Sequence, residues 1–363
     1  MKNKILIGPV NDRDVGAVPS LNRFIMKGLS SKYNFIPFST NRKYGKSNLS
    51  KFNVINIIYF FKEYLNFLYL LFFKRPSIVH YPITSFWNLE KSLVFLNTAK
   101  LLFVKNVFGH LHGGSFDKFW ENAHPVRRKI ALRLINNLNL IIVSSEYWRK
   151  YLEKIGVKTS IKVIYNVIDP RFESRFKNID EINREGKYLF IGSLGKRKGV
   201  YDLIDISRKN KLKINIIGEE DKKGDLKKIK GLIDKHNLEQ IINLIISEKL
   251  QINEKVEFFK KSKAFLFPSY NENFPLVIIE AACAGIPIIT TPVGALPEFF
   301  THMKNIYFVE PGNINEISNA IKYIHNNPVE SLKLGKLARE VFKERLSTDI
   351  IMKQLDGIYL KSL

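Results

Sequence analysis

The sequence predicts an α/β protein with two doubly wound domains, each built on a parallel sheet, and a cleft between them. Three observations favour this class. Short β-branched runs alternate with helical stretches, the alternation stops once at a charged stretch and then resumes, and 363 residues exceed the size at which one core keeps growing. The sequence shows no internal repeat of fixed short period, which excludes a solenoid.

The first domain is expected over residues 1–168. Its strand-like runs are KILIG near the start, SIVHY at 77–81, LIIVSS at 140–145 and IKVIYN at 161–166. Helical stretches separate these runs, as in a parallel sheet. The last helical stretch, about 346–363, has no strand after it and is expected to pack back on this domain.

The second domain is expected over residues 169–345. It begins with a charged stretch of poor periodicity, 169–187, which is typical of an interdomain linker. Six strand-like runs follow, with helical segments in most of the gaps between them. These runs are 188–192, 213–218, 242–245, 264–269, 287–291 and 306–309.

The most apolar stretch is INIIYFFKEYLNFLYLLFF, residues 55–73. A membrane span would place Lys62 and Glu63 near the bilayer centre at roughly 2.5–3.5 kcal/mol each, which argues against a span. Asn56, Lys62, Glu63 and Asn66 fall within one arc of about 120° on a helical wheel. The stretch therefore predicts an amphipathic helix, either packed on the sheet with a narrow solvated stripe or lying on a membrane surface.

The net charge of +24 is uneven along the chain. Residues 1–180 hold 29 Lys and Arg against 11 Asp and Glu, a net charge of +18, and the remainder carries +6. This asymmetry indicates an anionic partner for the first half, either nucleic acid or an acidic membrane surface, unless it reflects compositional drift. Neither a secretory signal nor an internal disulfide is expected, since the first apolar run is short and Cys283 is the only cysteine. The chain is expected to be cytoplasmic, with Cys283 a small buried residue.

Two glycine-containing turns are candidate binding loops. In GSLGKRKG, residues 192–199, glycines allow close backbone approach and three consecutive cations attract phosphate, although solvated surface is the alternative. In HGGSF, His112 precedes paired glycines, and either a structural or a functional histidine fits the pattern. The sequence shows no second His or Cys at metal-ligand spacing, so no metal site is predicted.

Glu272 and Glu280 lie at the two ends of an apolar segment. AFLFPS predicts a strand, YNEN its turn, and LVIIEAACA a helix that Pro275 precedes. Glu272 then belongs to the loop and Glu280 to the helix, about 7.5 Å beyond Pro275. With the helix N–H groups near Leu276 between them, the two carboxylates suit the ends of a ligand with an anionic middle, such as a sugar nucleotide.

These residues resemble the retaining glycosyltransferases of family 4, and the resemblance spans nearly the whole chain. ENFPLVIIEAACAGIPIITTPVGALPE is similar to that family's E-x7-E motif, and GSLGKRKGVYDLI to its diphosphate loop. NVID resembles its hinge motif, HGGSF its acceptor-side histidine loop, and GAVPSLNRF its first glycine-rich loop. The resemblance implies the GT-B fold, in which two Rossmann-like domains face each other across a cleft.

Carried over to this chain, the resemblance implies a role for each matching residue. Glu272 would contact donor-sugar hydroxyls, Glu280 the ribose, and Lys198 the leaving diphosphate. His112 would lie by the reacting sugar, and Gly16 would let the first loop approach the donor. The pocket for the sugar and phosphates would be lined by the backbone of Asn273, Phe274, Pro275 and Leu276. After Gly192 the family's usual arginine is Ser193 here, so that Arg197 or Lys196 would substitute for it.

The expected function is transfer of a hexose, with retention, from a nucleotide diphosphate sugar to a lipid-linked or polysaccharide acceptor of capsule, exopolysaccharide or O-antigen type. Fixed cations at the diphosphate make a metal or other cofactor unnecessary. The basic N-terminal domain would bind the acceptor at the inner membrane face, and the C-terminal domain the donor. The alternatives are a GT-B epimerase of nucleotide sugars and a basic nucleic-acid-binding protein.

Overall fold

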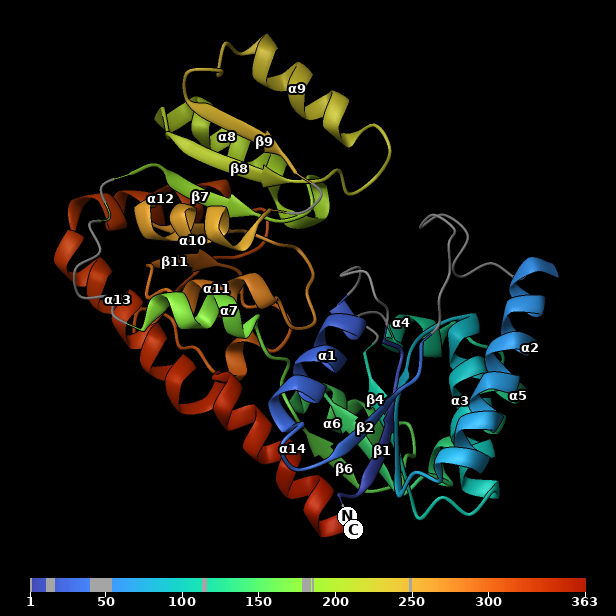
Figure 1. Ribbon diagram of the computed structural model, residues 1–363. Coiled ribbons are helices and arrows are strands. Elements are labelled where there is room, and N and C mark those ends of the chain that lie inside the picture. The colour runs from blue at the N-terminus through green and yellow to red at the C-terminus, as the bar shows by residue number, and fades with distance from the viewer. Residues whose placement is uncertain are drawn as a thin grey trace. The chain divides into compact units, whose positions relative to one another are not determined.

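The computed structural model describes residues 2–10, 17–39, 54–112, 116–177, 184, 186–247 and 250–363. The chain divides into an N-terminal unit, 1–166 with 349–363, and a C-terminal unit, 167–348. Each unit holds one six-stranded sheet whose paired strands are all parallel, with helices around it (Figure 1). The predicted fold class, with two Rossmann-like domains, is therefore confirmed.

The N-terminal sheet has the strand order β2-β1-β3-β4-β5-β6. Two of these strands, β2 and β4, were not predicted. The strand β2 has only four residues and ends at Pro37. In β4, Gly109 and His110 interrupt the run of apolar residues. Neither segment therefore contains the β-branched run by which the other strands were predicted. The strands are β1 (Lys4–Ile7), β2 (Asn34–Pro37), β3 (Ile78–Ile83), β4 (Asn106–Leu111), β5 (Leu140–Val143) and β6 (Ile161–Val163).

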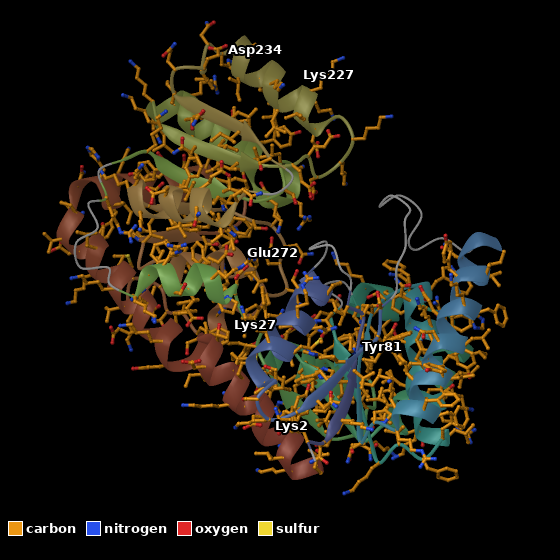
Figure 2. The ribbon with its side chains drawn as sticks, viewed as in Figure 1. Lys2, Lys27, Tyr81, Lys227, Asp234 and Glu272 are labelled. Atoms are coloured by element: carbon orange, nitrogen blue, oxygen red, sulfur yellow. The ribbon has the colours of Figure 1, made fainter. Side chains whose placement is uncertain are left out.

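Helices cover both faces of this sheet. Figure 1 shows α2, α3 and α5 together on one side, and α1 and α14 on the other. Under α2 and α3 the core is aromatic: the rings of Phe67 and Phe95 lie 4.9 Å apart, and Tyr81 packs 5.3 Å from Phe95 (Figure 2). The helices are α1 (Ala17–Leu29), α2 (Val54–Tyr69), α3 (Trp87–Leu101), α4 (Phe116–Glu121), α5 (Pro125–Asn136), α6 (Glu146–Lys154) and α14 (Thr348–Ser362).

The last helix, α14, belongs to the N-terminal unit although almost the whole C-terminal unit precedes it in the chain. Its Asp356 forms an ion pair with Lys32 and accepts a hydrogen bond of 2.7 Å from the Tyr33 hydroxyl. On α1, Gly28 leaves room for Met352, because an added Cβ would lie 3.2 Å from that side chain. Polar contacts and close helix packing thus hold the C-terminal segment on the first sheet.

The helix α2 continues into a π-helical turn, Leu70–Lys74, and its predicted polar arc is only partly solvated, because Lys62 and Asn66 are exposed whereas Glu63 is not. Glu63 is buried at 7% exposure and pairs with Lys91 of α3, because the polar arc partly faces the neighbouring helix. The outward side is instead largely apolar, with Phe61 and Leu65 59% and 66% exposed. Among the described residues, no helix is long and apolar enough to cross a membrane.

The C-terminal sheet has the order β12-β11-β10-β7-β8-β9. Its strands are β7 (Tyr188–Ile191), β8 (Ile214–Gly218), β9 (Ile242–Ile246), β10 (Phe265–Phe267), β11 (Ile288–Thr290) and β12 (Tyr307–Phe308). Its helices are α7 (Pro170–Glu173), α8 (Val200–Asn210), α9 (Asp225–Lys235), α10 (Ile252–Lys261), α11 (Leu276–Cys283), α12 (Ile314–Asn326) and α13 (Pro328–Val341), followed by a π-helical turn, Phe342–Leu346.

The segment expected to be a linker begins with ordered structure. After α7 a short 3-10 turn, Ser174–Phe176, follows, and Phe172 and Phe176 are each 1% exposed. Buried Arg339 donates hydrogen bonds to the carbonyl oxygens of Phe176 and Cys283. The linker interpretation was wrong for 170–176, because two aromatic residues one helical turn apart anchor this segment in the C-terminal unit.

Candidate functional site

The candidate site lies at the carboxyl ends of β7 and β10, which are neighbours in the C-terminal sheet. From β7 the chain continues to β8 on one side, whereas β10 occupies the other side. Such a switch in strand order leaves two loops diverging at the sheet edge, where α/β proteins bind ligands. The loops here are 192–199 after β7 and 268–275 after β10, and Figure 2 marks Glu272 in the second.

Glu272 is the centre of this site. Its Oε1 forms an ion pair with Lys198 Nζ and accepts a 2.8 Å hydrogen bond from Ser269 Oγ. Arg197 Nη1 lies 3.8 Å from the same oxygen. The side chains of Glu272 and Lys198 are only 9% and 14% exposed. One carboxylate and two cations from loops 74 residues apart therefore meet here. The charges of Glu272 and Lys198 act strongly because both side chains are largely buried, whereas Arg197 is 43% exposed.

The backbone holds the two loops together. Tyr270 N–H donates a 2.9 Å hydrogen bond to the carbonyl oxygen of Arg197, and Ser269 Oγ lies 3.1 Å from the same carbonyl oxygen. Gly199 ends the basic turn at a φ of 76°, and an added Cβ would lie 2.2 Å from the Pro268 carbonyl oxygen. Only glycine fits this position, so Lys198 is placed by backbone geometry and by its ion pair together.

Burial controls the electrostatics of the basic turn. Desolvation lowers the pKa of Lys198, and the neighbouring Glu272 opposes that shift. The Lys198 ammonium also lies 5.2 Å from the Phe267 ring centroid, a cation–π contact. Arg197 pairs with Asp221 at 2.8 Å, and both Arg197 and Lys196 are exposed. The turn therefore concentrates positive charge beside Gly192 and Ser193, as an anion-binding loop requires.

The segment after Glu272 leads into α11. Asn273 lies against Gly294, whose φ of 62° and close approach would bring an added Cβ within 2.4 Å of the Asn273 carbonyl oxygen. Phe274 is 8% exposed and packs edge-on against Phe299. Pro275 caps the helix, whose first turn from Leu276 carries no acidic residue. The N-terminus of α11 thus keeps its partial positive charge beside the Glu272 loop.

Glu280 occupies a separate environment on α11. It is 8% exposed, and its carboxylate lies 2.6 Å from Lys255 Nζ of α10. The structure therefore does not bring the two glutamates into one contact: Glu272 pairs with Lys198 of the basic turn, and Glu280 pairs with Lys255 of α10. Lys255 also lies 5.8 Å from the Phe172 ring centroid, which places this pair beside the α7 segment.

His112 lies in the N-terminal unit, directly after β4. Its backbone N–H donates to the Ile83 carbonyl oxygen at 3.0 Å, and its ring packs 3.9 Å from the ring of His110. Burial, together with the nearby His80, lowers the pKa of His112 to about 3. His112 is therefore a neutral imidazole at a strand end. Gly16 lies outside the described residues.

Sequence reasoning missed three members of this site: Ser269, Asp221 and Lys255. Ser269 precedes Glu272 by three residues, so its place at the strand end could have indicated a partner for the carboxylate. Asp221 and Lys255 come from other loops and helices, and nothing near them in the sequence marks them. Cys283 is 1% exposed, and burial raises the pKa of its thiol. In the part of the chain that the structure describes, no group of three His, Cys, Asp or Glu residues could hold a metal ion.

Family models match both parts of the chain. Residues 171–341 match the model of glycosyl transferases group 1, and residues 40–172 match that of glycosyltransferase family 4. The two matches together extend from residue 40 to residue 341 and are both to glycosyltransferase models. The family 4 match lies almost entirely in the N-terminal unit. The group 1 match covers the loops that carry Lys198 and Glu272.

Curated relatives are similar to this chain over about half of its length. An uncharacterized glycosyltransferase of Methanocaldococcus jannaschii is 30% identical over 212 residues, 57% of this chain and 56% of that protein. The capsular polysaccharide biosynthesis glycosyltransferase CapM of Staphylococcus aureus is 25% identical over 177 residues, 47% of this chain and 44% of CapM. The matched regions thus span about half the length of these relatives.

Solved structures share this two-domain fold. Sucrose-phosphate synthase of Thermosynechococcus elongatus has a TM-score of 0.78 at 16% identity and covers 99% of both chains. Anabaena HepE, in a complex with UDP-glucose, has a TM-score of 0.73 at 17% identity, covering 99% of this chain and 100% of that one. At such low identity the likeness is one of fold.

Proposed function

We propose that the protein is a retaining glycosyltransferase that moves a hexose from a nucleotide diphosphate sugar to a lipid-linked or polysaccharide acceptor. The observation that carries this proposal is the Glu272, Lys198 and Arg197 cluster at the strand-order switch of the C-terminal sheet. A carboxylate suits sugar hydroxyls, and two adjacent cations suit a diphosphate. The UDP-glucose complex of HepE and the capsule pathway named for CapM support the same donor and acceptor classes.

The chemistry follows from where charge develops. When the sugar–phosphate bond breaks, negative charge grows on the diphosphate and positive charge on the sugar carbon. Lys198, with Arg197 beside it, stabilises the leaving group, and the N–H groups at the start of α11 add to this field. Because fixed cations do this work, we propose that transfer needs no metal ion.

Glu272 and Glu280 have different roles in this proposal. Glu272 accepts hydrogen bonds from donor-sugar hydroxyls, and Glu280 holds the ribose hydroxyls near Lys255. The Glu272 carboxylate is engaged by Lys198 and Ser269, so we do not assign it as a nucleophile. We therefore propose transfer on the front face of the sugar, with retention at the anomeric carbon. In the N-terminal unit, His112 contacts the reacting sugar.

The first experiment identifies the donor. Thermal shift with UDP-, GDP-, ADP- and dTDP-sugars should show stabilisation by one nucleotide class, because a ligand that binds the native state raises its stability. Incubation of that donor with and without a glycan or lipid-linked acceptor separates transfer from epimerisation, and NMR of the product gives the anomeric configuration. An isomerised donor without acceptor, or an inverted product, would contradict the proposal. Activity that EDTA abolishes would contradict metal independence.

The second experiment tests the site. Lys198→Met and Glu272→Gln should each lower kcat by roughly 100- to 1000-fold, the usual effect of removing one preorganised transition-state contact. Lys333→Met and Glu330→Gln change exposed residues of α13 and should leave kcat unchanged. Wild-type turnover in either site variant would remove this cluster from the mechanism.

We also propose that the protein works on the inner face of the membrane, through the N-terminal unit. The outward side of α2 and its π-helical turn carries large apolar side chains at spacings of three and four residues, between 52% and 66% exposed: Ile58, Phe61, Leu65, Tyr69 and Phe72. Exposed Lys62, Lys74 and Arg75 accompany them, while Glu63, the one carboxylate of this segment, is buried. Apolar side chains flanked by cations suit an anionic membrane surface, as does the +18 charge of residues 1–180.

Vesicle flotation tests this placement. Binding should be stronger to phosphatidylcholine vesicles that contain phosphatidylglycerol than to phosphatidylcholine alone, and Phe61→Ser with Phe72→Ser should weaken it. The double variant Val329→Ser and Leu332→Ser removes exposed apolar side chains from α13 of the C-terminal unit and serves as the matched control. Equal binding to neutral and anionic vesicles would contradict the membrane proposal.

A further inference from the structure

Two histidines and a tyrosine form a buried hydrogen-bonded series in the N-terminal unit. The Tyr359 hydroxyl lies 2.6 Å from His80 Nδ1, and His80 Nε2 lies 3.0 Å from His110 Nδ1. Tyr359, His80 and His110 are 0%, 1% and 2% exposed. His80 pairs in register with Phe108, so His110, two residues further along β4, presents its side chain on the same face of the sheet. This is the face that α14 covers with Tyr359.

The direction of these hydrogen bonds follows from counting protons. Within the described residues, the Tyr359 hydroxyl has one hydrogen-bond partner, His80 Nδ1, and a buried O–H normally donates. His80 Nδ1 then accepts, which places the His80 proton on Nε2, from which it is donated to His110 Nδ1. The His110 proton is therefore on Nε2. The reverse order would leave the buried Tyr359 O–H without an acceptor.

A second proton on either imidazole ring would change the direction of these hydrogen bonds. Burial prevents this protonation near pH 7. Desolvation lowers the pKa of His80 to about 4. Burial also lowers the pKa of His110 well below its ordinary value, with the neighbouring His112 and His80 adding to the shift. Both rings are therefore neutral near pH 7, and each has one N–H and one acceptor nitrogen.

The series ends on an atom without a partner. His110 Nε2 is buried and has no hydrogen-bond partner within the described part of the chain. Because the two ring nitrogens face different ways and Nδ1 faces His80, Nε2 faces away from His80. The His112 ring packs against His110 at 3.9 Å, directly after the carboxyl end of β4. Strand ends of this kind are where α/β proteins place their ligands.

We propose that Tyr359 and His80 hold His110 as the Nε2–H tautomer, and that this N–H donates a hydrogen bond to an oxygen of the sugar substrate beside His112. The substrate role rests on the proposed glycosyltransferase function, whereas the proton order does not. In this arrangement His110 is the substrate contact, and His80 and Tyr359 are positioning residues. The C-terminal helix α14 thereby contributes to a binding site at the end of β4, in the first third of the sequence.

NMR of ring nitrogens in the full-length protein tests the proton order. The chain has seven histidines, so 15N-histidine labelling with single substitutions assigns the signals. His80 and His110 should both show the neutral Nε2–H tautomer at pH 7. A neutral Nδ1–H form of His110, averaged tautomers, or a charged ring would overturn the proposal.

A matched pair of tyrosine variants tests the source of that order. Tyr359→Phe removes the donor and should convert His80 and His110 to mixed tautomers. Tyr33→Phe removes a hydroxyl that bonds to Asp356 in the same region, and it should leave both tautomers unchanged. Unchanged tautomers in Tyr359→Phe would overturn the role of Tyr359, and circular dichroism confirms that each variant is folded.

Substitution of His110 tests the substrate contact. In His110→Gln an amide N–H can take the place of Nε2–H, whereas His110→Met fills a similar volume without a donor. With the donor sugar found by thermal shift, His110→Met should lower kcat/KM roughly 10-fold or more, and His110→Gln should restore part of the loss. Equal kcat/KM in folded Met and Gln variants would overturn the substrate contact. Failure of the wild type to transfer any sugar would overturn the proposed function and this contact together, and the tautomers would still decide the proton order.

Discussion

Acidification should destabilise the N-terminal unit well before its carboxylates are protonated. His80 has a pKa of about 4 in the folded protein and an ordinary value of 6.5 when unfolded, because burial disfavours its charged form. Between these values the unfolded chain binds a proton that the folded chain does not. The free energy of unfolding is therefore highest above pH 6.5 and falls as the pH drops toward 4.

The magnitude follows from the same pKa values. For each pH unit below 6.5, protonation of His80 stabilises the unfolded state by about 1.4 kcal/mol. At pH 5 His80 alone therefore lowers the free energy of unfolding by about 2 kcal/mol. The pKa of His110 and that of His112 are also lowered, so the total loss exceeds this value. Burial of Asp356 opposes its ionisation, but hydrogen bonds from Lys32 and Tyr33 outweigh this effect and lower its pKa. The stability that Asp356 contributes is lost only below its ordinary pKa of 3.8, outside this range.

Urea unfolding at pH 7 and pH 5, followed by tryptophan fluorescence, measures this loss. All three tryptophans, Trp87, Trp120 and Trp148, lie in the N-terminal unit, so the signal reports on that unit. The variant His80→Asn should lose about 2 kcal/mol of the pH dependence, whereas His236→Asn, on the C-terminal unit, should keep all of it. A free energy of unfolding that stays within about 0.5 kcal/mol between the two pH values would refute the reasoning.

Three further predictions concern single side chains. Gly199→Ala should destabilise the protein by about 1–3 kcal/mol in urea unfolding and lower kcat, because the added Cβ would collide with the Pro268 carbonyl oxygen and displace Lys198. Unchanged stability and kcat would contradict this close approach. Glu280→Gln should weaken donor binding about 10-fold in calorimetry while kcat at saturation changes little; a pure kcat effect would count against a ribose contact. Glu63→Gln should cost about 2 kcal/mol in urea unfolding because it removes the buried carboxylate charge that pairs with Lys91. No loss would show that this ion pair is not stabilising.

The fold could be predicted because its signals are local. Runs such as KILIG and YLFIG predict strands because β-branched and aromatic residues suit a buried parallel sheet. KILIG forms β1, and YLFIG forms β7. The strand β4 was missed because Gly109 and His110 break that local pattern. Gly109 packs closely against β3, since an added Cβ would lie 2.5 Å from the end of the Ile83 side chain, which would have to shift. His110 is tolerated because another histidine, from β3, supplies a partner.

The candidate site was predictable where its residues follow strands. Lys198 and Glu272 were found because each comes after a strand-like run, and parallel strands end at one edge of the sheet. Their ion pair, and the hydrogen bond from Ser269, depend on β7 and β10 being neighbours, which no pattern in the sequence reveals. Lys255 was missed for the same reason, since it meets Glu280 only through the packing of α10 beside α11.

The sequence by itself determined the class of the protein: two α/β domains, an excess of positive charge in the first half, and the glutamates and basic turn that resemble a glycosyltransferase. Periodicity, composition and motif spacing are properties of neighbouring residues, so the chain displays them before it folds. Only the tertiary structure decided which charges pair, which face of α2 is exposed, and that Tyr359 of the last helix meets His80 and His110. These contacts join residues up to 324 positions apart, as in the pair of Lys32 and Asp356, and residues so far apart in the sequence meet only when the sheets and helices pack.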